Sequence, residues 1–436
     1  MKKLTTACPG LHGSLQVPGD KSISHRAAMM GAIAQGTTRI RNFLKGQDCL
    51  TTLQAFKELG VEIAEAEDGT IVIHGQGFAG LQKPSKTLDM GNSGTTTRLL
   101  MGLLAGTDFE TRLVGDKSLE KRPMSRVAEP LKDFGAVIEL SDAGTLPCVI
   151  HGQNLHSANV QLQVASAQVK SALIFAALRG ERESTIVEQL PTRNHTEIML
   201  RQFGARVETE VDGLTIHVWP GELQACDVLV PGDISSAAFF MTAAAIVPNS
   251  DVTLTKVNLN PTRTGIVRVL DQMGAKMTIS RLPGAGEPLG NIRVQSSDLR
   301  PIELGAKDVP AVIDELPLVA LLAACAKGRS KITGAGELRV KETDRIKTVT
   351  QELRKLGVEV EELPDGMIIQ GRSNWAVKEA NLASYGDHRL GMMDAVAALK
   401  SQVPLTLADE GAISVSYPGF FSDLEKLLKA DRQSKF

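Results

Sequence analysis

The segment LQAFKELGVEIAEAEDGTIVIHG, residues 53–75, decides the fold, because its pattern returns four more times along the chain. In each copy a helical stretch ends in Leu, Phe or Met followed by glycine, and alternating apolar and polar residues come next. Glycine suits the left-handed residue that ends many helices, and the period-two alternation predicts β-strands. The other copies are residues 131–152, 200–221, 270–295 and 353–371, and the marker glycines are Gly60, Gly135, Gly204, Gly274 and Gly357.

A second kind of helix, rich in Ala and Leu, precedes each copy and occurs once more near the C-terminus. These helices are apolar on nearly all faces, which predicts that they are buried. The marker glycines are about 70 to 80 residues apart, too long for a solenoid repeat and suitable for a compact βαβαββ repeat. The six apolar helices are predicted at residues 24–36, 96–106, 171–180, 235–247, 316–328 and 388–400.

A longer repeat overlies the short one, because QVPGDKSISHRAA at residues 16–28 echoes LVPGDISSAAFF at residues 229–240. Six βαβαββ repeats in two groups of three predict an α/β (α+β) chain of two similar domains. We expect one domain at residues 21–232 and the other at residues 1–20 plus 233–436. The chain would then cross twice between them, and we expect the active site in the cleft between the domains.

The composition supports a globular protein and excludes several partners. The chain has 436 residues, of which 42% are apolar and 22% charged, as in globular proteins with more than one core. Aromatic residues make up only 4%, which disfavours nucleic-acid binding by base stacking. The net charge of −2 gives no general attraction to polyanions, so bound anions must meet local clusters of cations.

The cysteines and the start of the chain bear on localisation. The five cysteines are scattered and form no CxxC, as expected for free thiols in a reducing compartment and not for a metal site. The segment MKKLTTACPGLHG has no apolar core of a signal peptide. No apolar run reaches the roughly 18 residues of a membrane span. We therefore expect a cytoplasmic enzyme with no membrane partner.

Two helix starts in the first half pair small residues with a cation. They are GDKS at residues 19–22, leading to Arg26, and GNSGTTTR at residues 91–98. Backbone N–H groups at a helix start bind anions, and small residues let a phosphate or carboxylate approach closely. GDKS lacks the full P-loop pattern, so a P-loop is excluded. Taken alone, each segment is equally consistent with an ordinary capped helix.

Arg122 and a polar trio add to these candidates. Arg122 lies in the cation-rich segment GDKSLEKRPMSR, and Pro123 restricts its backbone and is expected to begin a helix. The trio Ser166-Ala167-Gln168 begins an Ala-rich helix. It can hydrogen-bond substrate hydroxyls or a phosphate, or it can simply cap the helix.

The second half supplies carboxylates. Asp314 stands just before an apolar helix, and Lys341, Glu342 and Arg345 occur within five residues in GELRVKETDRI. Glu342 and Arg345 by themselves are also consistent with a surface ion pair. His388 begins the last Ala-rich helix, where a single histidine is more often structural than catalytic.

The combination is more informative than its parts. Cations or small polar residues recur at the starts of five predicted buried helices from both halves, and the two carboxylates come from the second half. If these helix ends face one cleft, that cleft holds many positive groups and an acid–base pair. It would suit two small, multiply charged anions, bound in part by bidentate arginines.

The strings that carry these residues resemble, in order, the signatures of 5-enolpyruvylshikimate-3-phosphate synthases. That family's fold has two pseudo-threefold domains, each of three βαβαββ repeats with buried helices, also described as an inside-out α/β barrel. RVKETDR and GDHR are the most specific strings. The seven strings are PGDKSISHRA, MGNSGTTTRLL, GDKSLEKRPM, SAQVKSALIFAAL, DELPLVALLAA, RVKETDRI and YGDHRLGMM, between residues 18 and 393.

The resemblance implies one reaction of the shikimate pathway, on the route to chorismate and the aromatic amino acids. The carboxyvinyl group of phosphoenolpyruvate would pass to the 5-hydroxyl of shikimate 3-phosphate through a tetrahedral intermediate, and phosphate would be released. No metal and no organic cofactor are expected. We expect a monomer whose partners are these two small molecules.

The resemblance also implies a set of site residues. Asp314 would take the proton from the 5-hydroxyl, Glu342 would protonate the methylene carbon and reclaim a proton, and Lys21 and His388 are further catalytic candidates. Phosphoenolpyruvate would contact Lys21, Gly94, Arg122, Gln168, Arg345 and Arg389. Shikimate 3-phosphate would contact Lys21, Ser22, Arg26, Ser166, Ala167, Gln168, Arg193, Asp314 and Lys341.

Three positions deserve comparison with the family pattern. Val415 stands where some members carry a lysine, which leaves a second cation on the departing phosphate in question. Glu337 stands where other members have Asn, which alters the expected shikimate 3-phosphate site. Gly94 is retained, and in the family this small residue is associated with sensitivity to glyphosate, so we expect ordinary sensitivity.

Two other functions stay open at this point. UDP-N-acetylglucosamine enolpyruvyl transferases share the fold and the donor but usually carry a reactive Cys where this chain has SLEKRPM, and no cysteine lies between Cys49 and Cys148. A catalytically silent anion-binding protein on the same fold is the second alternative. Such a protein would need the cations but not the acid–base carboxylates.

Overall fold

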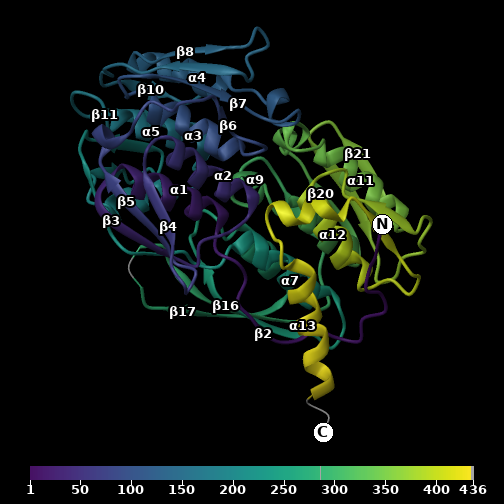
Figure 1. Cartoon of the computed structure of the whole chain (residues 1–436). Helices are drawn as coiled ribbons and strands as arrows, with labels where there is room; N and C mark the ends of the chain where they lie inside the picture. The colour runs from purple at the N-terminus through teal and green to yellow at the C-terminus, as the bar shows by residue number, and fades with distance from the viewer. Residues whose placement is uncertain (285, 434–436) are drawn as a thin grey trace. The chain divides into compact units, whose positions relative to one another are not determined.

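The computed structural model describes residues 1–284 and 286–433, and the chain divides into two units (Figure 1). Unit 1 comprises Met1–Pro18 and Pro231–Phe436, and unit 2 comprises Gly19–Val230. The chain thus passes from one unit to the other at two places. Each crossing falls two residues before the predicted boundary.

Unit 2 contains three sheets with one topology. In the middle sheet, β6 and β7 are parallel and flank α3, whereas β9 and β8 follow α4 and continue the sheet antiparallel. The sheet β10-β11-β13-β12 repeats this order with α5 and α6. In the remaining sheet, the first strand is supplied by β14 and β15 from the far end of the unit, both parallel to β3. Each sheet with its helices is therefore one βαβαββ repeat.

The strands of unit 2 are β3 (Ala34–Arg41), β4 (Glu62–Glu65), β5 (Ile71–Gln76), β6 (Leu88–Asp89), β7 (Glu110–Val114), β8 (Val137–Leu140), β9 (Cys148–His151), β10 (Asn159–Gln161), β11 (Ser184–Val187), β12 (Val207–Thr209), β13 (Thr215–Val218), β14 (Leu223–Gln224) and β15 (Val228–Leu229). Its helices are α1 (Lys21–Ile33), α2 (Gln47–Glu58), η1 (Phe78–Gly80), α3 (Gly94–Leu104), η2 (Leu119–Lys121), α4 (Ser125–Leu131), η3 (Lys132–Phe134), α5 (Ala167–Ala177) and α6 (His195–Gln202).

The described part of unit 1 also contains three sheets. In β17-β18-β16-β2, strand β2 precedes the first crossing and pairs in parallel with β16, which follows the second crossing. The sheet β19-β20-β22-β21 has the same order of parallel and antiparallel pairs. In the sheet β1-β24-β23, the N-terminal strand β1 pairs antiparallel with β24. Unit 1 and two of these three sheets thus join residues from before the first crossing with residues from after the second.

The strands of unit 1 are β1 (Lys2–Lys3), β2 (His12–Leu15), β16 (Asp251–Asn258), β17 (Lys276–Leu282), β18 (Leu289–Gln295), β19 (Glu303–Leu304), β20 (Gly328–Ile332), β21 (Glu359–Leu363), β22 (Gly366–Gly371), β23 (Asn381–Ala383) and β24 (Thr406–Ala408). Its helices are α7 (Ile234–Ile246), α8 (Gly265–Gln272), α9 (Val309–Val312), α10 (Leu316–Cys325), η4 (Gly336–Val340), α11 (Arg345–Lys355), α12 (His388–Ala398), η5 (Glu410–Val415) and α13 (Phe420–Gln433).

The marker glycines end helices as predicted. Their φ angles lie between 80° for Gly274 and 89° for Gly357, in the left-handed region that a side chain disfavours. At Gly357 a Cβ atom would also lie 2.0 Å from the carbonyl oxygen of Ala376, so any larger residue would displace the backbone. The repeated glycine is therefore required by geometry.

Three of the apolar helices begin at the polar motifs that precede their Ala- and Leu-rich stretches. Helices α1, α3 and α5 start at residues 21, 94 and 167, two to four residues before the Ala- and Leu-rich stretches. The side chains of Asp20, Ser93 and Ser166 accept hydrogen bonds from the backbone of the first turn and so begin each helix. Candidate residues therefore lie on first helical turns.

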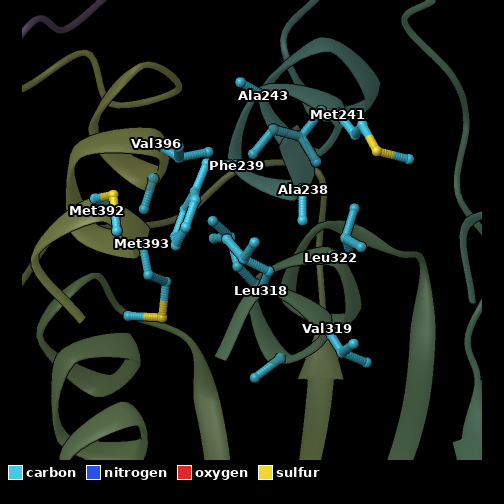
Figure 2. Packing of buried hydrophobic residues seen from close by; sticks show 14 of the residues in the cluster. Ala238, Phe239, Met241, Ala243, Leu318, Val319, Leu322, Met392, Met393 and Val396 are labelled. Atoms are coloured by element: carbon cyan, nitrogen blue, oxygen red, sulfur yellow. The ribbon is translucent and has the colours of Figure 1, made fainter. Parts of the chain in front are cut away.

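The apolar helices form the cores of both units. All 13 residues of α7 are buried, and α7, α10 and α12 contact one another. Figure 2 shows Phe239, Leu318 and Val396, one from each helix, pointing toward one another. The predicted burial of these helices is confirmed, and with it the predicted two-domain fold. Within the described residues, no helix combines the length and the apolar character that crossing a membrane requires.

Candidate functional site

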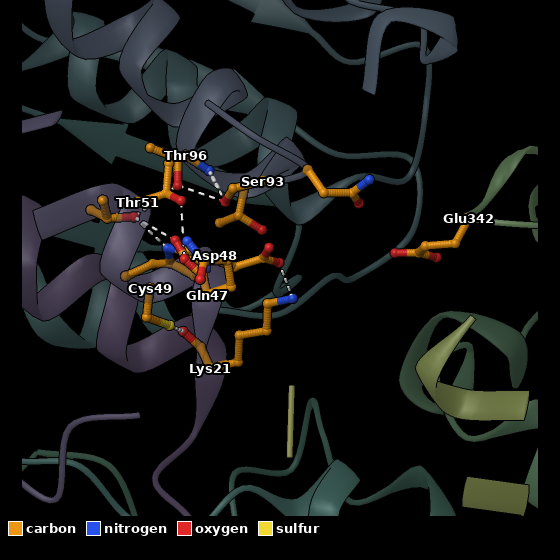
Figure 3. Close-up of polar contacts among 12 residues, drawn as sticks. Lys21, Gln47, Asp48, Cys49, Thr51, Ser93, Thr96 and Glu342 are labelled. Carbon is orange, nitrogen blue, oxygen red and sulfur yellow. Dashed lines mark hydrogen bonds and ion pairs between the residues drawn. The ribbon is translucent and has the colours of Figure 1, made fainter. Parts of the chain in front are cut away.

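A chain of buried hydrogen bonds joins helices α1, α2 and α3 in unit 2. Nδ1 of His25 lies 2.7 Å from Oγ1 of Thr52, which lies 2.7 Å from Oγ1 of Thr96, and Thr96 lies 2.6 Å from Oγ of Ser93. Burial, and after it the charge of Lys21, lowers the pKa of His25 to about 3. The imidazole is therefore neutral at pH 7, and the chain of hydrogen bonds ties the three helices together. Figure 3 shows its last link, between Thr96 and Ser93 at the start of α3.

Lys21 is the first residue of α1 and forms an ion pair with Asp48 in the first turn of α2, as Figure 3 shows. The thiol of Cys49 lies beside it and donates to the carbonyl oxygen of Lys21, with 3.7 Å between sulfur and oxygen. The side chain of Lys21 remains 24% exposed, so the ammonium group is held by a carboxylate while part of it stays accessible.

Arg26 lies one turn further along α1 and is only 2% exposed. Its Nε donates to Oγ1 of Thr196 at 2.6 Å and its Nη2 to Oγ of Ser171 at 2.7 Å. Its Nη1 donates to the carbonyl oxygen of Ser22 at 3.0 Å. Arg26 thus joins α1 to α5 and α6, while Ser22 contributes its backbone to the same contact.

Gly94 and Arg122 face each other at the start of α3. A Cβ atom at Gly94 would lie 3.3 Å from Nη1 of Arg122. Nη2 of Arg122 donates to Oδ1 of Asn92 at 2.6 Å, and its buried Nε has no hydrogen-bond partner among the described residues. A buried cationic donor without a partner is costly, which favours an anionic ligand here.

Gln168 lies on the first turn of α5 and contacts α3 with both ends of its amide. Its Oε1 accepts a hydrogen bond from Nη1 of Arg98 at 2.5 Å, and its Nε2 donates to Oγ1 of Thr95 at 2.9 Å. These contacts fix the orientation of the amide. They also bring the starts of α3 and α5 together.

The other candidates of unit 2 flank α5 and α6. Ser166 is the N-cap of α5, where its hydroxyl accepts from the backbone of Val169 at 3.4 Å, and Ala167 is the first residue of the helix. Arg193 lies half-buried in the loop between β11 and α6. Ser166 therefore has the capping role that the sequence left open.

In unit 1, three carboxylates surround one guanidinium group. Arg345, the first residue of α11, has a side chain that is 1% exposed. Its Nε lies 2.7 Å from Oδ2 of Asp387, its Nη2 2.6 Å from Oε2 of Glu342 and its Nη1 3.9 Å from Oδ1 of Asp314. Burial would lower the pKa of Arg345, but the three carboxylates together raise it above its ordinary value.

Arg389 lies on the first turn of α12 and approaches Asp314 from a different helix. Its Nη1 donates to the carbonyl oxygen of Asp314 at 2.9 Å, and its Nη2 lies 3.5 Å from Oδ2 of the same residue. Nη1 also lies 3.8 Å from Oε1 of the buried Glu315. Asp314 therefore stands between two arginines, with 16% of its side chain exposed.

Lys341 and His388 complete the set in unit 1. Burial lowers the pKa of Lys341 below its ordinary value, while the carboxylate of Asp314 partly opposes this shift. His388 is the buried first residue of α12 and follows its N-cap, Asp387. Burial alone would raise the pKa of Asp387, but Arg345 lowers it. The cluster thus combines an amine of lowered basicity with carboxylates held by arginines.

The structure thus groups the candidates of unit 2 at helix starts and those of unit 1 around Asp314. It also adds neighbours that the sequence reasoning did not single out. Asp387, Asn92, Arg98 and Glu315 had a local signal, since they lie in strings quoted above, whereas Asp48 lacked one. These neighbours are Asp48 for Lys21, Asn92 for Arg122, Arg98 for Gln168, Glu315 for Arg389 and Asp387 for Arg345.

The two positions that depart from the family pattern lie in short helices. Glu337 belongs to η4, and its charge raises the pKa of Lys341, although burial and nearer groups affect that pKa more. Val415 is the last residue of η5 and is half-buried. Glu337 therefore acts electrostatically on Lys341, a candidate ligand of shikimate 3-phosphate.

Comparisons with known proteins agree over almost the whole chain. Residues 6–424 match the family model described as EPSP synthase (3-phosphoshikimate 1-carboxyvinyltransferase). A 3-phosphoshikimate 1-carboxyvinyltransferase of Limosilactobacillus fermentum is 57% identical over 98% of this chain and 99% of that protein. The enzyme of the same name from Bacillus thuringiensis is 50% identical over 96% and 97% of the two chains.

Solved structures give the same result. EPSP synthase from Acinetobacter baumannii has a TM-score of 0.86 and 42% identity, over 98% of this chain and 97% of that one. The enolpyruvyl transferase NikO from Streptomyces tendae has a TM-score of 0.78 with only 18% identity, over the same shares of both chains. The second likeness shows a shared fold.

Proposed function

Since the chain belongs to the EPSP synthase (3-phosphoshikimate 1-carboxyvinyltransferase) family, we propose how its residues divide the work of the family's reaction. The chain transfers the carboxyvinyl group of phosphoenolpyruvate to shikimate 3-phosphate and releases phosphate, a step of the shikimate pathway. The family match argues against both alternatives left open by the sequence, which were a UDP-N-acetylglucosamine enolpyruvyl transferase and a catalytically silent binding protein. The division of roles rests on one observation, the position of Asp314 between Arg345 and Arg389.

Asp314 acts in this proposal as the general base. Its carboxylate takes the proton of the 5-hydroxyl while the hydroxyl oxygen bonds to C2 of phosphoenolpyruvate. Arg345 and Arg389 orient the carboxylate, and its partial exposure leaves room for a substrate hydroxyl. A positioned general base typically contributes a factor of about 10²–10⁴ in rate.

Glu342 acts on the methylene carbon. In its protonated form it donates a proton to C3 as the C2–O bond forms, which gives the tetrahedral intermediate. It takes a proton back from C3 as phosphate leaves, and the proton held by Asp314 passes to the departing phosphate. Its ion pair with Arg345 at 2.6 Å holds it on the same guanidinium as Asp314. Lys21 and His388 are proposed to assist these proton transfers.

Binding of the two anions is assigned to the cationic and small residues. Arg122, Arg345, Arg389 and Lys21 neutralise phosphoenolpyruvate, while Gly94 leaves the space that a side chain would fill. The unpartnered Nε of Arg122 supports this assignment. For shikimate 3-phosphate we retain Lys21, Ser22, Arg26, Ser166, Ala167, Gln168, Arg193, Asp314 and Lys341.

Neither unit by itself carries all the residues assigned to the reaction. Unit 2 carries Lys21 and Arg122, while unit 1 carries the acid–base carboxylates. We therefore propose that both sets act on the same pair of substrates. One chain supplies every residue in the scheme, so a monomer would suffice.

The test is phosphate release from phosphoenolpyruvate and shikimate 3-phosphate, compared between the wild type and Asp314→Asn. We expect the variant still to bind shikimate 3-phosphate by calorimetry, because the amide oxygen can accept a hydrogen bond from the hydroxyl, and to lose about 10²–10⁴ in kcat. Asp298→Asn, an exposed aspartate of the same unit, is the control and should retain wild-type kcat. Near-normal turnover by Asp314→Asn would remove Asp314 from the role of base.

A further inference from the structure

Glu352 is a fully buried carboxylate in the C-terminal half of α11, and it contacts the segment that leads into α12. Its Oε2 accepts a hydrogen bond from the backbone N–H of Ala383 at 3.1 Å. Its Oε1 accepts one from the hydroxyl of Tyr385 at 2.8 Å. The carboxylate therefore holds two residues that lie just before Asp387, His388 and Arg389.

Lys355, one turn further along α11, extends this contact. Its Nζ lies 2.7 Å from Oε1 of Glu352 and donates to the carbonyl oxygen of Asn381 at 3.2 Å. It also lies 5.7 Å from the centre of the Tyr385 ring. The Glu352–Lys355 pair thus contacts every second residue from 381 to 385, using backbone and side-chain groups.

The same helix holds the segment at a second place. Arg345 lies seven residues before Glu352, about two helical turns, and binds Asp387 at 2.7 Å. Tyr385 and Gly386 lie between the contacts at Ala383 and Asp387, and both have left-handed backbones, with φ of 53° and 77°. A tyrosine in this region is strained and persists only where its surroundings hold it.

The surroundings of Glu352 argue against a purely stabilising role. Asp394 on α12 is also buried, and neither of its carboxyl oxygens has a hydrogen-bond partner among the described residues. Burial raises the pKa of Asp394 most, and the charge of Glu352 raises it further. Replacing a buried ion pair by apolar residues is often neutral or stabilising. A charged Glu352 beside Asp394 is thus a costly way to pack two helices, but a suitable way to hold a backbone N–H and a hydroxyl.

We propose that Glu352, together with Lys355 and Tyr385, is a positioning residue that sets the place of His388 and Arg389 at the start of α12. This inference rests on the roles proposed above for His388 and Arg389. Glu352 touches neither substrate in this scheme. It acts through the segment from residue 383 to residue 389.

Two variants test the proposal. Tyr385→Phe removes one hydroxyl from a side chain that is 41% exposed, and Glu352→Gln removes the charge while keeping an acceptor. We expect KM for phosphoenolpyruvate to rise about tenfold in each, since hydrogen bonds to charged groups are worth about a factor of ten or more. KM for shikimate 3-phosphate should change less than twofold.

Hydrogen exchange supplies a readout that does not depend on catalysis. Backbone amides of residues 383–389 should exchange at least about tenfold faster in both variants, while those of α7 keep their protection. Tyr417→Phe is the matched control, because Tyr417 is the other tyrosine of the chain and its hydroxyl also donates to a carboxylate, that of Asp423 at 2.8 Å. It should leave both readouts unchanged.

The outcomes separate this inference from the proposed function. Unchanged exchange at residues 383–389 in Tyr385→Phe would overturn the positioning role, even if Glu352→Gln failed to fold. Faster exchange with an unchanged KM would overturn the link to phosphoenolpyruvate. A normal KM for phosphoenolpyruvate in Arg389→Met would refute the proposed role of Arg389. If Tyr385→Phe still showed faster exchange, the contact between Glu352 and the segment before α12 would stand by itself.

Discussion

Replacing Arg345 with methionine should cost unit 1 about 3–5 kcal/mol of unfolding free energy at pH 7. The guanidinium is the partner of Asp387 and Glu342, at 2.7 and 2.6 Å, and its side chain is 1% exposed. Methionine fills a similar volume but leaves a fully buried carboxylate without its cation. Breaking a buried pair by removing one partner is costly for this reason.

The deficit should depend on pH in a defined direction. Burial alone would raise the pKa of Asp387, but Arg345 lowers it below its ordinary value of about 3.9. A lowered pKa contributes stability that is present above the ordinary value and is lost as pH falls through the folded-state pKa. The variant lacks this contribution, so its deficit should be full above about pH 5 and shrink below about pH 4.

The two tryptophans of the chain make the assay specific to one unit. Trp219 belongs to unit 2, whereas Trp375 belongs to unit 1, where its indole donates to the carbonyl oxygen of Ala324 at 3.1 Å. In a Trp219→Phe background, fluorescence during urea unfolding reports on unit 1 alone. A deficit below about 1 kcal/mol, or one equal at pH 3.5 and pH 7, would refute the reasoning.

A matched control isolates the effect of burial. Arg372 forms an ion pair with Glu359 in the same unit, but their side chains are 64% and 63% exposed. Exposed pairs contribute about 0–1 kcal/mol, so Arg372→Met should change the unfolding free energy by less than about 1 kcal/mol.

Three further predictions follow from local geometry and charge. Gly94→Ala would place Cβ 3.3 Å from Nη1 of Arg122, so steady-state kinetics should show KM for phosphoenolpyruvate raised about three- to tenfold; an unchanged KM would count against this contact. Gly357→Ala should lower stability in urea by about 1–3 kcal/mol more than Gly213→Ala, because both glycines have positive φ but only Gly357 meets backbone atoms; equal losses would contradict this. Burial, and then the charge of Glu352, raises the pKa of Asp394, so the folded protein keeps a proton that the unfolded chain releases above about pH 4. The unfolding free energy of the wild type should therefore fall as pH rises above about 4, by up to about 1.4 kcal/mol per pH unit. Thermal unfolding of Asp394→Asn should lack this fall. Equal pH dependence of stability in the wild type and the variant would argue against a raised pKa of Asp394.

The architecture was readable from the sequence because its signals are local. A left-handed glycine after each helix and the alternation of the following strands depend on residues a few positions apart. The Ala- and Leu-rich pattern by itself begins too late, at residues 24, 96 and 171, whereas the polar motifs before it mark the starts of α1, α3 and α5. The reason is that a cap such as Asp20 is polar and lies before the apolar pattern that the prediction followed.

The sequence also identified the chemical groups of the candidate site, since Asp314, Glu342, Arg345 and Arg389 lie in recognisable strings at helix starts. It did not predict what each group contacts. Arg345 pairs with Asp387 42 residues away, and Gln168 pairs with Arg98 70 residues away. These pairs form where helices of one core bring their N-terminal ends together, and only packing decides which ends meet.

What the sequence by itself determined is therefore the repeat, its buried helices and the residue types at their ends. The tertiary structure alone decided that Arg26 binds other helices of unit 2, that three carboxylates share Arg345, and that Glu352 holds the segment before α12. The physical reason is range. Periodicity, caps and turns act within a few residues, whereas the burial and pairing of charges depend on groups that come together only when the chain folds.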